Sequence, residues 1–271
     1  MTRSSLKVLV ADDASFVHAL FRQIAETSPI PFECARADNG RESLELLARG
    51  DINLAFIDVN MPEMSGMEAV GAARLTGDKT FMVLMSALTS PRRLQLAHAL
   101  KVYEYLDKPF GSEEVVAILR TYCRVTDPIK ALVVDDSATA RRIVRKVLTR
   151  GIFNVEVTEA ADGQTALACC ERGGFDVTFL DCHMPGFDGL QTLERLMDRN
   201  PTAKVIMMTA DHSEGTLHWA LDRGATAFLY KPFSTADIDR ELHALFGLKL
   251  PELSTQDTGD LHAAADAAAW S

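Results

Sequence analysis

Carboxylate, hydroxyl and ammonium side chains follow several short apolar runs of the sequence, and together they could act on a phosphoryl group. In the first half of the chain the set is Asp12, Asp13, Asp58, Ser86 and Lys108. Three ionised carboxylates in one cleft repel one another, and a hard divalent cation with oxygen ligands keeps such a group charged. Mg²⁺ suits this task because it keeps several waters and accepts phosphate oxygens. A carboxylate beside Mg²⁺ can attack a phosphoryl group and form an acyl phosphate, whose oxygens the lysine and the hydroxyl would contact.

The same set recurs 123 residues later in the chain. The pairs related by this offset include Asp12-Asp13 and Asp135-Asp136, Asp58 and Asp181, Gly66 and Gly189, Ser86 and Thr209, and Lys108 and Lys231. No gap is needed anywhere in the interval. Solenoid repeats have periods of about 20–50 residues, so a period this long indicates a duplicated domain.

Short apolar runs alternate with helix-length amphipathic stretches in each copy. The first copy has clear runs at 8–11, 54–57, 81–85 and 103–106, and a weaker one near 32–35. Buried strands that alternate with helices indicate parallel βαβ units with right-handed crossovers. The sequence therefore predicts an α/β protein with two flavodoxin-like doubly wound (βα)5 domains, each with a five-stranded parallel sheet. Ligands bind at the carboxyl ends of such strands, where the chemical side chains above should gather.

The domain boundaries follow from the repeat and from Pro128. We expect one domain over 1–125, a short linker over 126–130, a second domain over 131–250 and a disordered tail over 251–271. Pro128 bars a helix from continuing through it, and it biases the residue before it toward an extended shape. The tail is polar and rich in alanine, with few large apolar residues.

Composition excludes several classes of protein. The chain has 28 basic and 38 acidic residues and a formal net charge of −10. No segment is basic, so binding to nucleic acid or to an anionic membrane surface is not expected. A membrane-spanning helix needs about 20 apolar residues, and no run approaches that length. We also expect no signal peptide, because the first apolar stretch is short and runs into Asp12. Five cysteines without a CxxC pair favour a reducing cytoplasm over a disulfide or zinc framework.

Several motifs resemble the receiver domain of two-component response regulators. They are the acidic pair after the first strand, IDVNMPEMSG around Asp58 and FLDCHMPGFDG around Asp181, MSA and MTA, and DKPF and YKPF. The resemblance covers residues 5–248 as two copies in tandem.

The resemblance implies a role for each matching position. Asp58 and Asp181 would be the phosphoacceptors. The magnesium ligands would be the carboxylates of Asp58 and Asp181, those of Asp13 and Asp136 directly, those of Asp12 and Asp135 through water, and the backbone carbonyls of Asn60 and His183. The switch hydroxyls, phosphoryl-binding lysines and switch aromatics would be Ser86 and Thr209, Lys108 and Lys231, and Tyr105 and Phe228. In this family the Lys-Pro bond is commonly cis, which makes Lys108-Pro109 and Lys231-Pro232 candidates.

The implied function is that of a cytoplasmic phosphoprotein with two receiver domains and no output domain. A histidine kinase or a phosphotransfer protein in a phosphorelay would supply its phosphoryl groups, and it would signal through protein contacts. It would not be a metabolic enzyme, because receivers promote only their own phosphorylation and dephosphorylation. Formation of a homodimer is compatible with this function. The alternatives are a phosphorylation-independent adaptor, a regulator whose output domain is on another chain, and an aspartyl-phosphate phosphatase. A phosphatase would need a second acid two residues after the nucleophile, where Asn60 and His183 stand.

Three further features have two interpretations or differ between the copies. His183 either modulates the access of water to Asp181 or is an ordinary solvent-facing side chain. The basic residues after the second acidic pair form either a solvated helix face or a kinase docking face: Arg141, Arg142, Arg145, Lys146 and Arg150. Gly224 precedes the last strand of the second copy, and Lys101 holds its place in the first. We expect this loss of glycine to change how the preceding helix ends.

Overall fold

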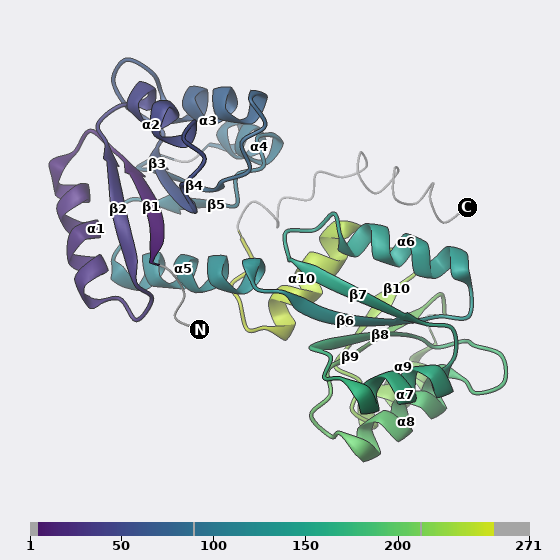
Figure 1. Ribbon diagram of the computed structural model, residues 1–271. Coiled ribbons are helices and arrows are strands. Elements are labelled where there is room, and N and C mark those ends of the chain that lie inside the picture. Colours follow the sequence, from purple (N-terminus) through teal and green to yellow (C-terminus); the bar gives the residue numbers. More distant parts are fainter. Residues whose placement is uncertain (1–4, 89, 212, 252–271) are drawn as a thin grey trace. The chain divides into compact units, whose positions relative to one another are not determined.

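Strands and helices alternate along the whole described part of this computed structural model, which comprises residues 5–88, 90–211 and 213–251 (Figure 1). The chain divides into two units, the first up to Cys123 and the second from Arg124 to Leu250. The predicted tail over 251–271 lies, apart from Pro251, outside the described residues.

The first unit has five strands and five helices in strict alternation. They are β1 (Leu6–Ala11), α1 (Ser15–Thr27), β2 (Phe32–Ala37), α2 (Gly40–Leu47), β3 (Leu54–Asp58), α3 (Gly66–Leu75), β4 (Phe81–Ser86), α4 (Pro91–Ala99), β5 (Glu104–Asp107) and α5 (Ser112–Thr126). Every strand pair is parallel, and the order in the sheet is β2-β1-β3-β4-β5.

The second unit repeats this arrangement. Its elements are β6 (Ile129–Val134), α6 (Ala138–Leu148), β7 (Val155–Ala160), α7 (Gly163–Arg172), β8 (Val177–Asp181), α8 (Gly189–Arg199), β9 (Val205–Thr209), α9 (Glu214–Asp222), β10 (Ala227–Tyr230) and α10 (Thr235–Leu245). Its parallel sheet has the order β7-β6-β8-β9-β10. The predicted fold class, two flavodoxin-like doubly wound domains, is confirmed.

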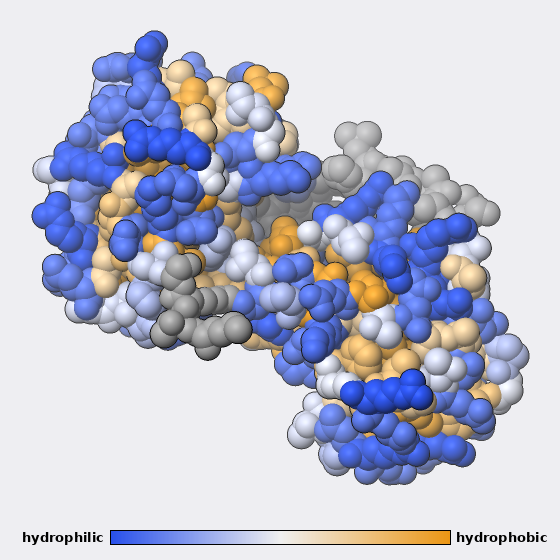
Figure 2. All heavy atoms as spheres, viewed as in Figure 1, coloured by the Kyte–Doolittle hydropathy of each residue, from blue (hydrophilic) through white to orange (hydrophobic). Residues whose placement is uncertain are grey.

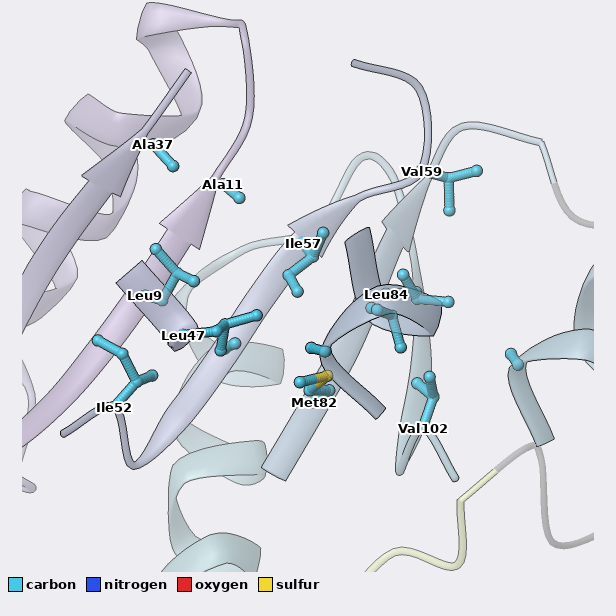
Figure 3. Close-up of a cluster of buried hydrophobic side chains, with 14 of the residues drawn as sticks. Leu9, Ala11, Ala37, Leu47, Ile52, Ile57, Val59, Met82, Leu84 and Val102 are labelled. Atoms are coloured by element: carbon cyan, nitrogen blue, oxygen red, sulfur yellow. The ribbon is translucent and has the colours of Figure 1, made fainter. Parts of the chain in front are cut away.

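Helices cover both faces of each sheet, which explains why the central strands are apolar at most positions. In β1, Leu9 packs into one buried cluster and its neighbours Val8 and Val10 pack into another. The cluster of Leu9 takes its helical side chains from α2, α3 and α4, and Figure 3 shows it with Leu47 close to the strand residues. The second cluster takes them from α1 and α5. Helices therefore cover both faces of the three central strands, and the carboxyl ends of these strands carry the polar side chains.

The second sheet is covered in the same way. A cluster on one face gathers residues of α7, α8 and α9, among them Leu167, Leu193 and Ala220. Helices α6 and α10 lie together on the other face (Figure 1). Buried residues on these two helices include Val144 and Leu242.

The connection between the two units is shorter than the expected linker over 126–130. Helix α5 continues to Thr126 and β6 begins at Ile129, so only Asp127 and Pro128 lie between them. The ring of Pro128 excludes the helical conformation only at Pro128 itself and disfavours it at the residue before. The helix can therefore run to Thr126.

The last residues of α5 belong to the second unit. The guanidinium of Arg124 lies 3.7 Å from the centroid of the Phe246 ring. The carbonyl of Val125 accepts a hydrogen bond of 2.8 Å from the backbone N–H of Asn154, and the Val125 side chain is buried. The division between the two units thus falls inside one helix.

The expected difference between the ends of α4 and α9 is wrong. Lys101 has a φ of 53°, and Gly224, its counterpart, has a φ of 95°. The backbone turns through the left-handed region after both helices. This region disfavours side chains with a Cβ, so Lys101 adopts at a cost what Gly224 adopts freely.

The surface is mostly hydrophilic in the view of Figure 2, with hydrophobic side chains in small patches. The large hydrophobic residues that are exposed are Phe16, Leu75, Leu88, Leu96, Ile152, Leu221 and Tyr230. Within the described ranges, none of the helices combines the length and the apolar character needed to cross a membrane.

Candidate functional site

In the first unit, a single ammonium group joins two buried carboxylates at the carboxyl ends of β1 and β3. Lys108 Nζ lies 2.6 Å from Asp12 Oδ2 and 2.7 Å from Asp58 Oδ1. Asp12 is fully buried and Asp58 is 5% exposed, whereas Asp13 is exposed. The remaining oxygens of the buried pair also have donors, since Ala14 N–H donates to Asp12 Oδ1 and Asn60 N–H donates to Asp58 Oδ2. The predicted gathering of these side chains is present.

Burial and the ion pairs pull the pKa values of this group in opposite directions. Burial raises the pKa of Asp58, and the hydrogen bond from Lys108 offsets only part of that effect. Burial alone would lower the pKa of Lys108, but the hydrogen bonds to Asp12 and Asp58 outweigh it and raise the pKa overall. Lys108 therefore stays charged, and its positive charge offsets the desolvation cost of the two buried carboxylates.

The second unit builds the same bridge. Lys231 Nζ lies 2.7 Å from Asp135 Oδ2 and 2.9 Å from Asp181 Oδ1. Ser137 N–H donates to Asp135 Oδ1 at 2.8 Å. Burial again raises the pKa of Asp181, against the hydrogen bond from Lys231. The pKa of Lys231 is raised because its hydrogen bonds to the two carboxylates outweigh the effect of burial.

Three carboxylates of the second unit are close enough to bind one cation. Ligand oxygens of Asp135, Asp136 and Asp181 all lie within 4.8 Å of one another, and Asp136 is exposed to solvent. Within the described ranges, the corresponding side chains of the first unit, Asp12, Asp13 and Asp58, do not meet that spacing. Hard oxygen donors with one open side fit Mg²⁺, which binds through few carboxylates and keeps water ligands.

The hydroxyls that end the fourth strand of each unit are hydrogen-bonded to the loop that follows them. Ser86 Oγ donates to the carbonyl of Leu88 at 2.9 Å and accepts from the Leu88 N–H at 3.2 Å. Thr209 Oγ1 accepts from the N–H of Asp211 at 2.9 Å. To reach a group on the neighbouring aspartate, each hydroxyl would have to leave its own loop.

The two aromatic residues differ in burial. The Tyr105 side chain is 2% exposed inside the cluster formed with α2, α3 and α4. Among the described residues, its hydroxyl is the one buried side-chain polar atom without a hydrogen-bond partner. Phe228 is only partly buried and packs against the corresponding cluster of the second unit. A buried hydroxyl without a partner is unfavourable, so the inward position of Tyr105 has a cost that Phe228 does not have.

A glycine brings the next helix against Asp58 in the first unit and against Asp181 in the second. A Cβ at Gly66 would lie 2.1 Å from the carbonyl oxygen of Asp58, and one at Gly189 would lie 1.9 Å from that of Asp181. Only glycine allows this approach of backbone to backbone. Ser65 caps α3 just before Gly66 in a capping box with Glu68, which fixes where the helix begins. Both prolines after the lysines, Pro109 and Pro232, follow cis peptide bonds, in agreement with the expectation from the family.

Sequence reasoning missed a side chain that holds the backbone of each acidic pair. In the first unit, His18 is buried and its Nε2 lies 2.7 Å from the carbonyl of Asp12. In the second unit, Arg141 takes this place and donates to the carbonyls of Asp135 at 2.7 Å and Asp136 at 3.3 Å. The offset of 123 residues pairs His18 with Arg141, so the repeat itself could have identified them.

One interpretation of the basic residues on α6 is a solvated helix face. Arg141 does not fit it, because its side chain is mostly buried. Its Nε lies 3.2 Å from Glu159 Oε2, and Arg145 pairs with the same carboxylate at 2.8 Å. The Arg141 side chain is 15% exposed and that of Arg145 is 51% exposed. Arg141 therefore contacts the backbone of the acidic pair from a mostly buried position, and Arg145 lies at the exposed edge of the site.

The residues two positions after Asp58 and Asp181, which are Asn60 and His183, are both exposed. Asn60 Oδ1 accepts a hydrogen bond of 3.4 Å from Arg93. His183 lies close enough to Asp211 for its charge to add to the effect of Ser213, whose hydrogen bonds lower the pKa of that carboxyl. The solvent-facing surroundings of Asp58 and Asp181 thus differ between the two units.

The profile of the response regulator receiver domain family matches residues 8–120 and 131–243. A chemotaxis protein CheY of Listeria monocytogenes is 37% identical over 117 residues, which are 43% of this chain and 95% of that protein. A protein-glutamate methylesterase/protein-glutamine glutaminase of Paramagnetospirillum magneticum is 39% identical over 116 residues, 42% of this chain. That match spans only 30% of the methylesterase.

Among solved structures, one described as a two-component system response regulator/GGDEF domain protein matches both units together. The TM-score is 0.60 and the match covers 89% of this chain and 100% of the other, at 24% sequence identity, which bears on the fold alone. The family profile covers most of the chain in two consecutive copies, and each copy carries the acidic pair, the aspartate that ends the third strand, the hydroxyl and the lysine at one sheet edge. The chain belongs to the response regulator receiver domain family of two-component systems, with two receiver domains in tandem.

Proposed function

We propose that both receiver domains accept a phosphoryl group, the first on Asp58 and the second on Asp181. The observation that carries this proposal is the lysine bridge, found twice: each lysine holds the acceptor and one buried acidic neighbour at the strand ends. A donor phosphohistidine on a kinase or phosphotransfer protein would supply the group. One Asp carboxylate oxygen attacks phosphorus, the P–N bond breaks, and the donor imidazole nitrogen keeps the electron pair.

The side chains of each site have separate tasks in this transfer. The lysine already lies against the acceptor carboxylate, so it can follow the new phosphoryl oxygens with little movement. Ser86 or Thr209 would turn from its own loop to donate to one of these oxygens. Tyr105 is already turned inward, which leaves room for the shift of the loop that follows Ser86. The receiver would then present an altered surface to a protein partner.

The clustered carboxylates of the second unit also support a magnesium site there, and the repeat extends this proposal to the first unit. Asp13 and Asp136 would bind Mg²⁺ directly, Asp12 and Asp135 through water, and Asn60 and His183 through their backbone carbonyls. When bound, the ion would neutralise charge on the phosphoryl oxygens. The three clustered carboxylates of the second unit are the observation that fits this ion best.

Intact mass after incubation with phosphoramidate and Mg²⁺ tests the assignment. We expect two added phosphoryl groups on the unchanged protein, one on Asp58→Asn, one on Asp181→Asn and none on the double variant. Asp198→Asn is the matched control, because this aspartate is exposed on α8 away from the strand ends. Modification of the double variant, or equal modification in the presence of a chelator, would contradict the proposal.

A further inference from the structure

The first site has a second cationic side chain for which the second site has no counterpart. Arg93 on α4 donates from Nη1 to the carbonyl of Leu88 at 3.0 Å and from Nη2 to Asn60 Oδ1 at 3.4 Å. Asn60 follows Asp58 at the end of β3, and Leu88 follows Ser86 at the end of β4. These strands are neighbours in the sheet. The guanidinium therefore spans the two loops that flank the acceptor.

The contacts of Arg93 lead directly to the reacting group. The N–H of Asn60 donates to Asp58 Oδ2 at 2.9 Å. The carbonyl of Leu88 is shared, because Ser86 Oγ also donates to it. If Ser86 turns toward a phosphoryl group on Asp58, Arg93 remains as a donor to that carbonyl, so the loop after β4 keeps one of its two restraints.

The corresponding residue of the second unit cannot form such a span. The offset of 123 residues places Thr216 where Arg93 stands. The Thr216 hydroxyl accepts from Ser213 Oγ at 2.9 Å and lies 3.5 Å from Asp211 Oδ2. Both partners lie in the segment after β9, so among the described residues Thr216 makes no contact with the loop after β8 that would correspond to the contact of Arg93 with Asn60. On the solvent side of Asp181, the residues in the corresponding place are therefore His183 and Asp211.

We propose that Arg93 is a positioning residue of the first receiver, which holds Asn60 and Leu88 together over Asp58 and slows hydrolysis of the acyl phosphate formed there. The inference rests on the proposed function, since it assumes that Asp58 is phosphorylated. Asn60 and Arg93 also line a shallow pocket of about 370 Å³ that is open to solvent. Without the guanidinium, water from this side gains a path to the phosphorus, and a positive charge near the phosphoryl oxygens is lost.

The lifetime of the phosphoryl group in an Asp181→Asn background tests this role. The protein is loaded with phosphoramidate and Mg²⁺, the donor is removed, and loss of the group is followed by intact mass. Arg93→Ala should shorten the lifetime by about three- to tenfold, the effect of losing one or two hydrogen bonds. Arg93→Lys should recover part of it, because an ammonium keeps the charge but cannot span both acceptors. Arg92→Ala is the matched control, since Arg92 lines the same pocket.

A second measurement does not depend on phosphorylation. Hydrogen exchange of the Leu88 amide should be faster in Arg93→Ala and unchanged in Arg92→Ala, because Arg93 restrains this residue through its carbonyl. A lifetime that is unchanged or longer in Arg93→Ala, or equally short in Arg92→Ala, overturns the inference. If Asp58 takes up no phosphoryl group at all, the proposed function fails for this domain. Unchanged exchange at Leu88 would then overturn the positioning role independently.

Discussion

Lys231 and Asp181 are joined at 2.9 Å, and the same ammonium is 2.7 Å from Asp135. The lysine comes from the end of the fifth strand of its sheet, and the two carboxylates come from the ends of the third and the first. One side chain therefore neutralises two buried acids that a parallel sheet brings to its edge. Removing it leaves two carboxylates without a cation.

Replacing this lysine should destabilise the second unit strongly. For Lys231→Ala we expect a loss of about 3–5 kcal/mol in the free energy of unfolding at pH 7, because buried charges are left unpaired. The loss should be smaller when Mg²⁺ is added, since the ion can take over the neutralisation. Urea unfolding followed by Trp219 fluorescence in a Trp270→Phe background measures it. Lys249→Ala, an exposed lysine, should have no effect.

Asp239 on α10 should make the stability of the second unit depend on pH. Burial raises the pKa of this carboxyl to about 7, from an ordinary value of 3.8. Because the folded state binds the proton more tightly, its contribution is fully present below about pH 4 and is lost as the pH rises to 7. At pH 8, Asp239→Asn should therefore raise the free energy of unfolding by roughly 2–4 kcal/mol.

The control for this pH dependence is Asp222→Asn, at an exposed position on α9. It should preserve the decline in stability between pH 4 and 7, whereas Asp239→Asn should flatten it. The amide can still accept the hydrogen bond that Ile152 N–H makes with Oδ1 at 3.4 Å. If both variants decline in parallel with the unchanged protein, Asp239 does not titrate in this range.

Tyr105→Phe should stabilise the first unit. The substitution keeps the ring in its buried place and removes the hydroxyl that has no hydrogen-bond partner. We expect a gain of about 1 kcal/mol in the free energy of unfolding. Trp219 lies in the second unit, so calorimetry, and not the fluorescence of Trp219, should measure this gain in the first unit. Tyr103→Phe is the comparison, because this ring packs on Phe81 and is only half-buried. A loss of stability in Tyr105→Phe would show that the hydroxyl is satisfied.

Exchanging the residues after α4 and α9 should change stability in opposite directions. Lys101→Gly should stabilise the first unit by about 0.5–1 kcal/mol, because glycine adopts a φ of 53° without strain. Gly224→Lys should destabilise the second unit by about 1–2 kcal/mol. A Cβ at Gly224 would also lie 2.5 Å from Met197 Cε. Effects of the same sign would contradict the shared backbone geometry.

The sequence predicted the fold and the five site positions of each copy because the positions are tied to strand ends. Asp58, Ser86 and Lys108 each end or follow an apolar run, and parallel strands bring their carboxyl ends to one edge. The pattern of apolar runs therefore places these residues in space without any long-range information. The internal repeat supports the assignment, since the same order occurs twice.

Other features depend on contacts that no local pattern encodes. Arg93 reaches Asn60 across 33 positions of the sequence, and only the packing of α4 beside β3 brings them together. The burial of Tyr105 depends on the other side chains of its cluster, which come from distant parts of the first unit (Figure 3). The end of α5 at Thr126 depends on how far a helix can approach Pro128 and on what its last turn meets. Sequence could name these residues but not their partners.

The position of the unit boundary inside α5 bears on how these receivers can be exchanged between proteins. A shortened chain that starts at β6 would lack Arg124 and Val125, so the Phe246 ring would lose its contact with a guanidinium and the Asn154 N–H would lose its acceptor. A first receiver cut after Thr126 would carry Arg124 and Val125 without the residues that they contact. Grafting either receiver onto another protein therefore requires the last turn of α5 to travel with the second receiver. A recombination point at Pro128, where the sequence pattern changes, would separate residues that fold together.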